Sequence, residues 1–453
     1  MTLATAPPAA LPRVFDAGAP VALPDGRRVP VAALNNAATT PPLAAVVDAV
    51  VAMLGEYGAL HRGSGPRARA TVDAVEEATA SIERFLGQPE ANTLLFTTNT
   101  SAAINHLARL LDLGPDDVVV TSEIEHTSNN LPWRHQSAAQ VVEARADDAG
   151  ALDLGHLAEV LHAWRGRVRI VAVTGASNLT GYRPDLATLA SLAHDAGALL
   201  FVDAAQLAPH RRIDMAASGV DVLAFSAHKV YAPFGLGVLS LPRAVLDRHP
   251  VDPGGGSIDM LASDGSVLWA PPAERHQTGT WNATGIVALG AAAAAILDAG
   301  WDAIEAHERA LTQVLVNRLA AVDGVHLTVD PARYGVEDRI GAVPFRVDGM
   351  HHALVASALE AEHGVEVRAG TICNHRLVRR WVGADDAEQA RIEAAIAGGD
   401  RLASYGVVRA SLGLQNTGAD VDRLVAGLRS LAAEGPALRY RPAPAQECWV
   451  PGW

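Results

Sequence analysis

Lys229 is the only lysine among the 36 Lys and Arg residues of the chain. It lies in the segment Phe225-Ser226-Ala227-His228-Lys229, at the end of the largely apolar run 220–224. A guanidinium stays protonated and is a poor nucleophile, whereas an amine can lose its proton and attack a carbonyl to form an imine. Composition alone is the alternative explanation, in an arginine-rich chain that kept one lysine. The residues elsewhere in the sequence favour the chemical explanation.

Polar side chains follow five β-rich runs of the sequence at the point where each run ends. In a parallel sheet covered by helices, ligands bind beyond the carboxyl ends of the strands. We therefore expect these side chains to surround one site. They are Asn99, Thr100 and Ser101 after the first run, His126 after the second, Asn178 after the third, Asp203 and Gln206 after the fourth, and Ser226, His228 and Lys229 after the fifth.

The elements that must position these side chains alternate between strand and helix patterns from about residue 92 to residue 241. Such alternation predicts an α/β fold with a mostly parallel sheet covered by helices. The predicted strands are 93–97, 117–121, 168–174, 198–203, 220–225 and 237–241, with amphipathic helices such as 102–111 and 186–196 between them.

The pattern changes after residue 300, where a long helix over 301–322 precedes short strands and a last helix. The strands are predicted at 325–329, 342–346, 365–368 and 407–411, and the last helix at 420–434. This arrangement is typical of a smaller α+β domain. The expected divisions are an N-terminal extension (1–30), a large domain (31–300), a small C-terminal domain (301–438) packed with part of the N-terminal segment, and an irregular tail (439–453) docked by its aromatic residues.

Composition favours a globular enzyme in a reducing compartment. The 453 residues are 49% hydrophobic and 19% charged, and the net charge of −14 argues against broad binding to nucleic acid or to anionic membranes. The start of the chain, 1–12, lacks the basic residues and long apolar run of a secretory signal, and the apolar run 285–297 is too short to span a membrane. The 2 cysteines are expected to be free thiols, and the cytoplasm is the expected location.

As a set, these residues resemble the fold-type I pyridoxal-phosphate (PLP) enzymes of aminotransferase class V, and within them the group II cysteine desulfurases. The resemblance runs from Asn35-Asn36-Ala37-Ala38-Thr39-Thr40 through Val408-Arg409-Ala410-Ser411 and into the last helix. It implies a fold-type I PLP-dependent transferase with a large PLP-binding domain. It also implies a homodimer with a shared active site.

The resemblance gives Lys229 two tasks, a Schiff base with PLP and then transfer of the Cα proton of the substrate as general base. Asp203, in Phe201-Val202-Asp203-Ala204-Ala205-Gln206, would keep the pyridine nitrogen protonated so that the ring accepts electrons. Gln206 and Asn178 would bond the phenolic oxygen of the ring, and His126 would stack on its face. Taken singly, Asp203 has the alternative of a helix N-cap, and His126 that of an ordinary surface residue.

The phosphate group of the cofactor needs donors at a helix N-terminus, which Thr100 and Ser101 would supply with hydroxyls as well as amides. Ser226 and His228 match the other phosphate contacts of the family. Where the family has Gly-Thr-Thr, this chain has Asn99-Thr100-Ser101, so we expect Asn99 to adopt the backbone shape of the glycine. Gly279-Thr280 resembles the segment that reaches the phosphate from the partner subunit.

Arginines and one cysteine carry the predictions about the substrate. Arg409 matches the residue that binds an amino acid α-carboxylate in bidentate fashion, Arg368 would assist it, and Asn36 and Ala37 match neighbouring substrate contacts. For any single arginine the alternative is a solvated surface charge.

The stretch Arg368-Ala369-Gly370-Thr371-Ile372-Cys373 resembles the group II motif that presents a nucleophilic thiol. An inert buried thiol is the alternative for Cys373. The chain departs from the family at Thr127, Ala232, Thr371 and Ile372, and in the spacing of about 35 residues between Cys373 and Arg409. These departures leave the partner surface and the exact substrate open.

The leading hypothesis is a cysteine desulfurase that takes sulfur from L-cysteine as a Cys373 persulfide and releases alanine, with a sulfur-acceptor protein as a possible partner and no metal. A second hypothesis keeps PLP and changes the reaction to carbon–sulfur cleavage, β-elimination or epimerisation of a biosynthetic amino acid. The departures at Thr371 and Ile372 and the long segment 374–406 favour it. A third, a binding protein that only kept the fold, is disfavoured because the full set of Lys, Asp, His and Arg is present.

Overall fold

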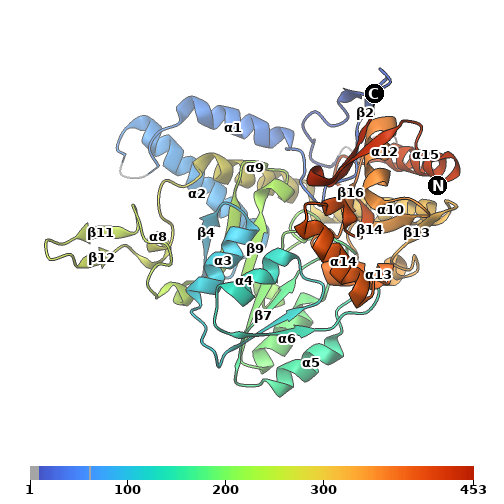
Figure 1. Ribbon diagram of the computed structural model, residues 1–453. Helices are drawn as coiled ribbons and strands as arrows, with labels where there is room; N and C mark the ends of the chain where they lie inside the picture. Colours follow the sequence, from blue (N-terminus) through green and yellow to red (C-terminus); the bar gives the residue numbers. More distant parts are fainter. Residues whose placement is uncertain (1–9, 61–62, 453) are drawn as a thin grey trace.

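The computed structural model describes residues 10–60 and 63–452 (Figure 1). Residues 1–9, on which part of the expectation about secretion rests, and Trp453 of the predicted tail lie outside the described residues. A seven-stranded sheet in the order β4-β10-β9-β8-β7-β5-β6 forms the centre of the part of the chain that is predicted to be the large domain. Its strands are β4 Asn92–Thr97, β5 Val118–Ser122, β6 Gln140–Ala144, β7 Val168–Thr174, β8 Leu199–Asp203, β9 Val222–Ser226 and β10 Gly237–Pro242.

Each of the six strands predicted for this sheet is present, with ends within two residues of the prediction. Strand β10 runs antiparallel to β4 and to β9, whereas β5 to β9 pair in parallel. The α/β fold with a mostly parallel sheet is therefore confirmed. Strand β6 at the sheet edge was not predicted.

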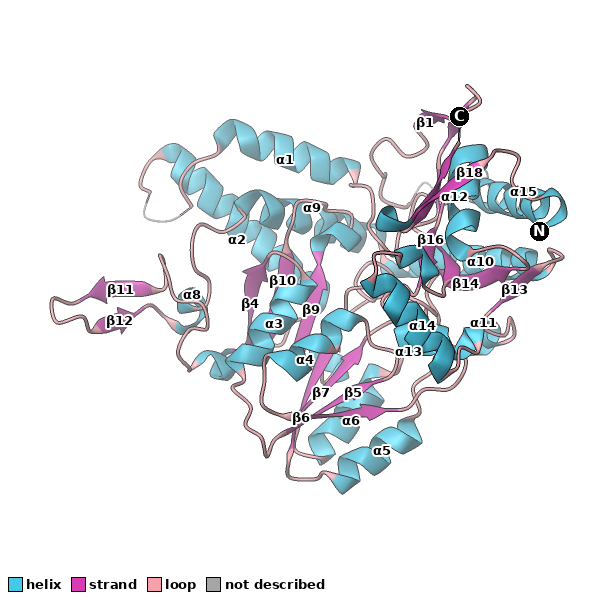
Figure 2. Ribbon diagram, in the orientation of Figure 1, coloured by secondary structure: helices cyan, strands magenta, loops and turns pink. Residues whose placement is uncertain are grey.

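Successive residues of the central strands pack on opposite faces of the sheet, since side chains alternate along a strand. In β8, Leu200 and Val202 join one buried cluster while Phe201 joins another. Helices cover both faces, which explains why these strands are nearly all apolar (Figure 2). The helices of this part of the chain are α1 Ala44–Glu56, α2 Pro66–Leu86, α3 Thr100–Leu110, α4 Leu131–His135, α5 Leu154–Ala163, α6 Leu186–Asp195, α7 Met215–Ser218, α8 Pro272–Arg275 and α9 Ala283–Ala299.

A third buried cluster belongs to the C-terminal part, around an antiparallel sheet in the order β13-β14-β17-β16. Its strands are β13 Val325–Leu327, β14 Ala342–Val347, β16 Arg368–Gly370 and β17 Val407–Ser411. Its helices are α10 Trp301–Ala320, α11 Arg333–Val336, α12 His352–His363, α13 His375–Val382, α14 Asp386–Ala397 and α15 Gly418–Glu434.

The strand predicted at 365–368 is in fact divided between two sheets. Its first part, β15 Val365–Glu366, pairs in parallel with β3 Ala32–Ala33 from the N-terminal segment. Its second part continues as β16 against β17. The prediction of one strand was wrong because two different partner strands compete for consecutive residues, and periodicity does not show a change of partner.

The tail was predicted to be irregular, and this was wrong. It forms a hairpin of β18 Tyr440–Ala443 and β19 Cys448–Pro451 that packs beside α12 (Figure 1). Aromatic residues do dock it, since the Tyr440 hydroxyl donates to Glu362 Oε1 at 2.9 Å and the Trp449 ring lies 6.4 Å from that of His351. Prolines in both strands hid the hairpin, because proline disfavours a central strand but is tolerated in an exposed two-stranded ribbon.

Two further hairpins, β1 Pro20–Ala22 with β2 Arg28–Pro30 and β11 Ile258–Leu261 with β12 Val267–Trp269, complete the strands. The second projects away from the body of the molecule (Figure 1). Within the described residues, no single helix combines the length and apolar character needed to cross a membrane. Helices α9 and α10 meet both criteria only together, as a pair bent by 84°.

Candidate active site

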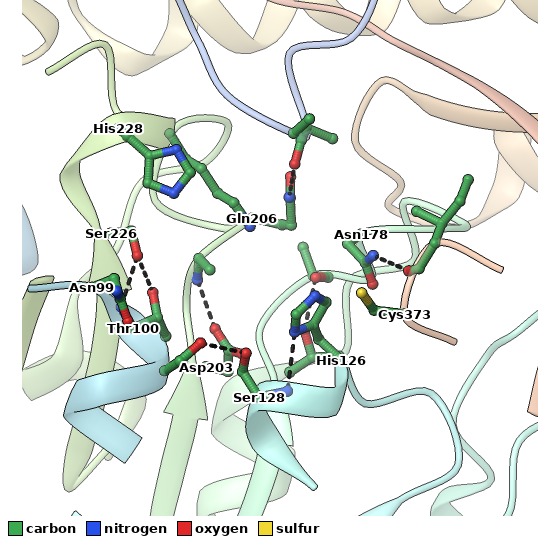
Figure 3. Close-up of a pocket in the computed structure, with 18 of the residues that line it drawn as sticks. Asn99, Thr100, His126, Ser128, Asn178, Asp203, Gln206, Ser226, His228 and Cys373 are labelled. Carbon is green, nitrogen blue, oxygen red and sulfur yellow. Dashed lines mark hydrogen bonds between the residues drawn. The ribbon is translucent and has the colours of Figure 1, made fainter. Parts of the chain in front are cut away.

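A cavity of about 470 Å³ opens at the carboxyl ends of the parallel strands. Most of the residues singled out from the sequence lie in its wall, although they come from both parts of the chain. The predicted residues that line it are Ala37, Thr100, Ser101, His126, Asn178, Asp203, Gln206, Ser226, His228, Lys229, Arg368, Cys373 and Arg409. Figure 3 shows Asn99, Thr100 and Ser226 at one end of this cavity and Cys373 beside Asn178 at the other.

Lys229 reaches the cavity from a short 3-10 turn, Ala227–Lys229, that directly follows β9. The turn is fixed from the N-terminal segment, because the Thr40 amide and hydroxyl both donate to the His228 carbonyl, at 3.0 and 3.1 Å. Burial lowers the pKa of Lys229, and the positive charge of Arg409 adds to this effect, while Asp203 opposes it. A larger fraction of the amine is thus neutral at pH 7 than in a solvated lysine, and this neutral fraction can act as a nucleophile or accept a proton.

Asp203 lies at the end of β8, buried beneath the cavity. One carboxylate oxygen accepts a hydrogen bond from the Ala205 amide at 3.0 Å. The residues that follow form turns rather than a helix, so Asp203 is not a helix cap. Burial raises the pKa of Asp203, and Lys229 opposes the rise. The charge of this buried carboxylate is only partly balanced by Lys229, so it would bind strongly to a cationic N–H group placed in the cavity.

The two amide side chains, Gln206 and Asn178, join the cavity to the rest of the chain. Gln206 Nε2 donates to the Ala37 carbonyl at 2.6 Å, and Asn178 Nδ2 donates to the Ile372 carbonyl at 2.8 Å. Gln206 Oε1 is buried without a hydrogen-bond partner in the described part of the chain. Each amide nitrogen keeps a second N–H, so both side chains can still donate to an oxygen in the cavity.

His126 follows β5 and caps a 3-10 turn, with its Nδ1 accepting from the Ser128 amide at 3.1 Å. Burial, together with the positive charges of Lys229 and Arg409, lowers the pKa of His126 to about 4. The ring is therefore neutral at pH 7, which suits stacking against an aromatic ligand.

Glu125, the residue before His126, was missed by the sequence reasoning. It is buried, with Ser122 Oγ 2.5 Å from Oε1 and Asn129 Nδ2 2.6 Å from Oε2. Burial raises the pKa of Glu125 to about 8, with a contribution from Asp203. The sequence signal was its position just beyond a strand end.

The N-terminus of α3 lies at the end of the cavity that is predicted to bind the phosphate. The Thr100 amide donates to Ser226 Oγ at 2.7 Å, and the two hydroxyls lie 2.6 Å apart. Asn99 caps the helix by accepting from the Ala102 amide at 2.9 Å. The expectation that Asn99 would need a glycine-like backbone was wrong. Its φ of −172° is extended backbone that any residue adopts.

Two arginines face each other in the small sheet, since Arg368 of β16 is the register partner of Arg409 of β17. Arg409 is buried and donates to the Asn178 carbonyl at 2.7 Å, while its Nε has no partner among the described residues. Burial and the charge of Arg368 lower the pKa of Arg409 to about 9. Within residues 10–60 and 63–452 neither guanidinium forms an ion pair with a carboxylate, so an anionic ligand would be bound strongly here.

Cys373 is exposed at the mouth of the cavity, on a loop with unusual backbone angles. Ile372 and Cys373 both have left-handed φ values, 51° and 58°, and Gly370 has φ 113°. A β-branched residue rarely adopts this region, so the surrounding contacts must hold it there. The glycine of the predicted motif is required by its own backbone angle.

Three predicted residues lie elsewhere. Asn36 does not line the cavity, and its side chain bonds Ala33, Ser411, Gln415 and Asn416 instead. Its hydrogen-bonding capacity is used within the protein, so we do not retain it as a substrate contact. Gly279 and Thr280 line a different cavity, of about 610 Å³ beside α2.

The lining of the first cavity fits the PLP that the sequence predicts. A lysine with a lowered pKa, a buried carboxylate, an unpartnered amide oxygen and a helix N-terminus with two hydroxyls lie around one space. Lys229 could bind the aldehyde, Asp203 the ring nitrogen, and Thr100, Ser101 and Ser226 the phosphate. The paired arginines are left for the substrate.

Comparison with known proteins agrees with this geometry. The family model for aminotransferase class V matches residues 32–424. A cysteine desulfurase of Dickeya dadantii is 33% identical over 89% of this chain and 92% of its own, and a probable cysteine desulfurase of Mycobacterium leprae is 35% identical over 88% and 92%.

Solved structures give the same result. The cysteine desulfurase CsdA of Escherichia coli, in an S-sulfonic acid form, has a TM-score of 0.73 at 29% identity over 88% of this chain and 94% of its own. The apo cysteine desulfurase of Thermococcus onnurineus has a TM-score of 0.77 at 28% identity, over 89% and 94%.

Proposed function

The chain belongs to the aminotransferase class-V family, whose members are PLP-dependent enzymes, and we propose that it is a cysteine desulfurase. The proposed reaction moves the sulfur of L-cysteine onto Cys373 as a persulfide and releases L-alanine. The observation that carries the proposal is that Lys229, Asp203, Arg409 and Cys373 line one cavity. Relatives that match most of the chain are named cysteine desulfurases, which supports it.

In this proposal the cofactor is PLP, which supplies an electron-withdrawing ring when it is bound. Lys229 would hold its aldehyde, Asp203 its protonated ring nitrogen, and Gln206 and Asn178 its phenolic oxygen. The neutral His126 would stack on its face. The phosphate contacts would be Thr100, Ser101, Ser226 and His228, with Gly279 and Thr280 of a second subunit.

The side chains of this chain would then divide the work. Arg409, assisted by Arg368, binds the α-carboxylate and orients the amino acid. The Lys229 amine accepts and returns the Cα proton, a task that its lowered pKa favours.

Cys373 Sγ attacks the substrate sulfur, so that an S–S bond forms as the C–S bond breaks. The electron pair of the broken bond stays with the β-carbon, which takes the proton given up by the thiol. Cysteine and thiol thus become alanine and persulfide, with atoms and electrons in balance.

The proposal includes a homodimer with a shared active site, a sulfur-acceptor protein, and a location in the cytoplasm. Gly279 and Thr280 support the dimer, because they border a cavity beside α2 rather than the cavity of Lys229. The acceptor is needed because the enzyme must lose the persulfide sulfur before the next turnover.

The test is to incubate the purified enzyme with L-cysteine and follow the visible spectrum, alanine, and added sulfur by peptide mass spectrometry. We expect one extra sulfur on Cys373, alanine in equal amount, and neither in Cys373→Ala. Cys448→Ala, which changes the other thiol, serves as the matched control and should behave like the wild type.

Full-rate alanine formation by Cys373→Ala without a reductant would refute the role of Cys373. If the visible spectrum does not change with cysteine but changes with another amino acid, the carbon–sulfur lyase or epimerase hypothesis would be supported instead. The altered residues Thr371 and Ile372 favour that hypothesis.

A further inference from the structure

Segment 374–406, which makes the Cys373–Arg409 spacing long, places helix α13 immediately after Cys373. This helix packs against the large domain, although the chain before it belongs to the small sheet. Leu377 and Val378 are buried in the hydrophobic cluster that holds most of the large domain's core and also contains Ile372. Gly150 fits against this site, since a Cβ there would lie 3.0 Å from Leu377 Cδ2.

Polar contacts extend this packing along the edge of the central sheet. Arg380 Nη2 lies 2.9 Å from Glu123 Oε2, and its Nη1 donates to the Ala146 carbonyl at 3.0 Å. Trp381 Nε1 donates to the Asp148 carbonyl at 2.7 Å. One turn earlier, Arg376 pairs with Glu143 of β6. The helix after the thiol is therefore attached to the strand-end loop that also carries His126.

The Cys373 loop needs such attachment, because it is strained and its own hydrogen bonds are few. Ile372 and Cys373 have left-handed backbone angles, which a free loop would relax. The Ile372 carbonyl accepts from Asn178 Nδ2, and the Asn374 amide donates to the Thr371 carbonyl. Beyond Asn374 the first contacts with the large domain are those of α13.

We propose that α13 is a clasp that holds Cys373 at the cavity mouth, with Arg380 and Trp381 as positioning residues for sulfur removal. The role of the clasp in catalysis rests on the proposed desulfurase function, whereas the attachment itself does not. The clasp is needed only in the step in which the Cys373 thiol attacks the substrate sulfur. Binding of cysteine and proton removal at Cα, which use Arg409 and Lys229, do not need it.

The experiment uses the charge-reversal variants Arg380→Glu and Glu123→Arg and the double variant, which restores an ion pair in the opposite sense. Trp381→Phe removes one hydrogen bond and keeps an aromatic side chain, so it tests the clasp without a new charge. Arg169→Glu is the matched control, because Arg169 pairs with Asp117 at 2.6 Å at the other end of β5, and the Asp117 carboxylate is about as exposed as that of Glu123.

Three measurements separate the steps: the spectral change on adding L-cysteine, the rate at which Cys373 gains sulfur in one turnover, and hydrogen–deuterium exchange of the peptide 371–384. We expect each single reversal to slow sulfur gain about fivefold, the upper range for a partly exposed ion pair. Amide exchange in the peptide should rise by a similar factor. The spectral change should stay within about twofold of wild type, since it precedes the need for the clasp.

The double variant should recover part of the lost sulfur gain, because it restores the ion pair but not the bond from Arg380 to the Ala146 carbonyl, and Arg169→Glu should match wild type throughout. Wild-type sulfur gain in both single reversals, or no recovery in the double variant, would overturn the proposal. If wild-type enzyme forms no persulfide but exchange still rises in the reversals, the attachment stands and the desulfurase function fails. Unchanged exchange with normal desulfuration refutes the clasp alone.

Discussion

Replacing Glu125 by glutamine tests whether a protonated carboxyl lies beneath the active site. Glu125 is 5% exposed and lies between Ser122 and Asn129, and burial raises its pKa to about 8. Glutamine has nearly the same shape and can keep the contact with Ser122. The substitution therefore removes a titration while changing the packing little.

The magnitude follows from the pKa difference between the folded and unfolded chain. An unfolded glutamate ionises near pH 4.5, so between pH 4.5 and 8 the folded protein keeps a proton that the unfolded chain has released. The contribution of Glu125 to the free energy of unfolding is therefore fully present below pH 4.5. It is lost as the pH rises from 4.5 through 8. At about 1.4 kcal/mol per pH unit, the loss reaches roughly 5 kcal/mol.

Glutamine at position 125 does not ionise, so the variant does not lose this free energy as the pH rises. Its free energy of unfolding relative to wild type should therefore increase with pH. An unfolding entropy of about 2 cal/mol/K per residue makes 1 kcal/mol correspond to roughly 1 °C for 453 residues. The melting temperature of the variant relative to wild type should thus rise by about 4 °C between pH 5 and pH 9, since only about 3 of the pH units over which stability is lost lie in this window.

The assay is thermal unfolding followed by circular dichroism in matched buffers from pH 5 to pH 9. Glu77→Gln, at an exposed position on α2, is the control and should follow the wild-type profile. Parallel profiles for Glu125→Gln and wild type would show that Glu125 is ionised in the folded protein, and the reasoning from burial would be wrong.

Four further predictions concern the remaining charged groups. Lys229→Arg should leave no residue that borohydride can link to PLP, as peptide mapping will show. Asp203→Asn should still bind PLP but form alanine about 10- to 100-fold more slowly, the value of a charge-assisted hydrogen bond. Arg409→Lys keeps the charge but loses the bidentate geometry, so kcat/KM for cysteine should fall by a similar factor. His210 and Arg211 outweigh the burial of Glu308 and lower its pKa to about 2. The contribution of this carboxylate to the free energy of unfolding is therefore fully present above pH 4.5, and it is lost as the pH falls towards 2. Glu308→Gln should destabilise the protein at pH 7 by about 3 to 5 kcal/mol, and by less at pH 3, as seen by thermal unfolding.

Residues at the carboxyl ends of strands were predictable from the sequence because topology alone brings those ends together. His126, Asn178, Asp203 and Lys229 line one cavity for that reason. The pairing of Arg368 with Arg409 depends on strand register in the small sheet, which no periodicity fixes. Here the resemblance to a family supplied what the pattern could not.

Other features depend on packing that the sequence does not display. Glu125 reads as a surface acid in sequence, and only the fold shows that Ser122 and Asn129 enclose it. Asn36 matches a family segment, yet its bonds to Asn416 and Gln415 are internal. The apolar residues of helix α13 could have suggested that the helix is partly buried. They do not indicate which domain it packs against.

A buried charge network connects the segments on one side of the cavity. Arg211, five residues after Gln206, bonds Glu308 of α10 at 2.7 Å and the Arg339 carbonyl at 2.9 Å. Arg339 in turn donates to the Thr180 carbonyl at 2.9 Å, next to the Asn178 segment. Buried charges are tolerated only when fully paired, so displacing any member costs several kcal/mol.

The network therefore fixes the segments that carry Gln206 and Asn178, and with them the side of the cavity proposed to bind the ring oxygen. The mouth of the cavity at Cys373 is held less firmly, because Arg380 and Glu123 are both partly exposed and their ion pair is correspondingly weak. Motion that admits substrate or releases sulfur has the lowest cost at Cys373. The strained loop at this mouth, rather than the proposed cofactor side, should then be the part that moves when sulfur leaves.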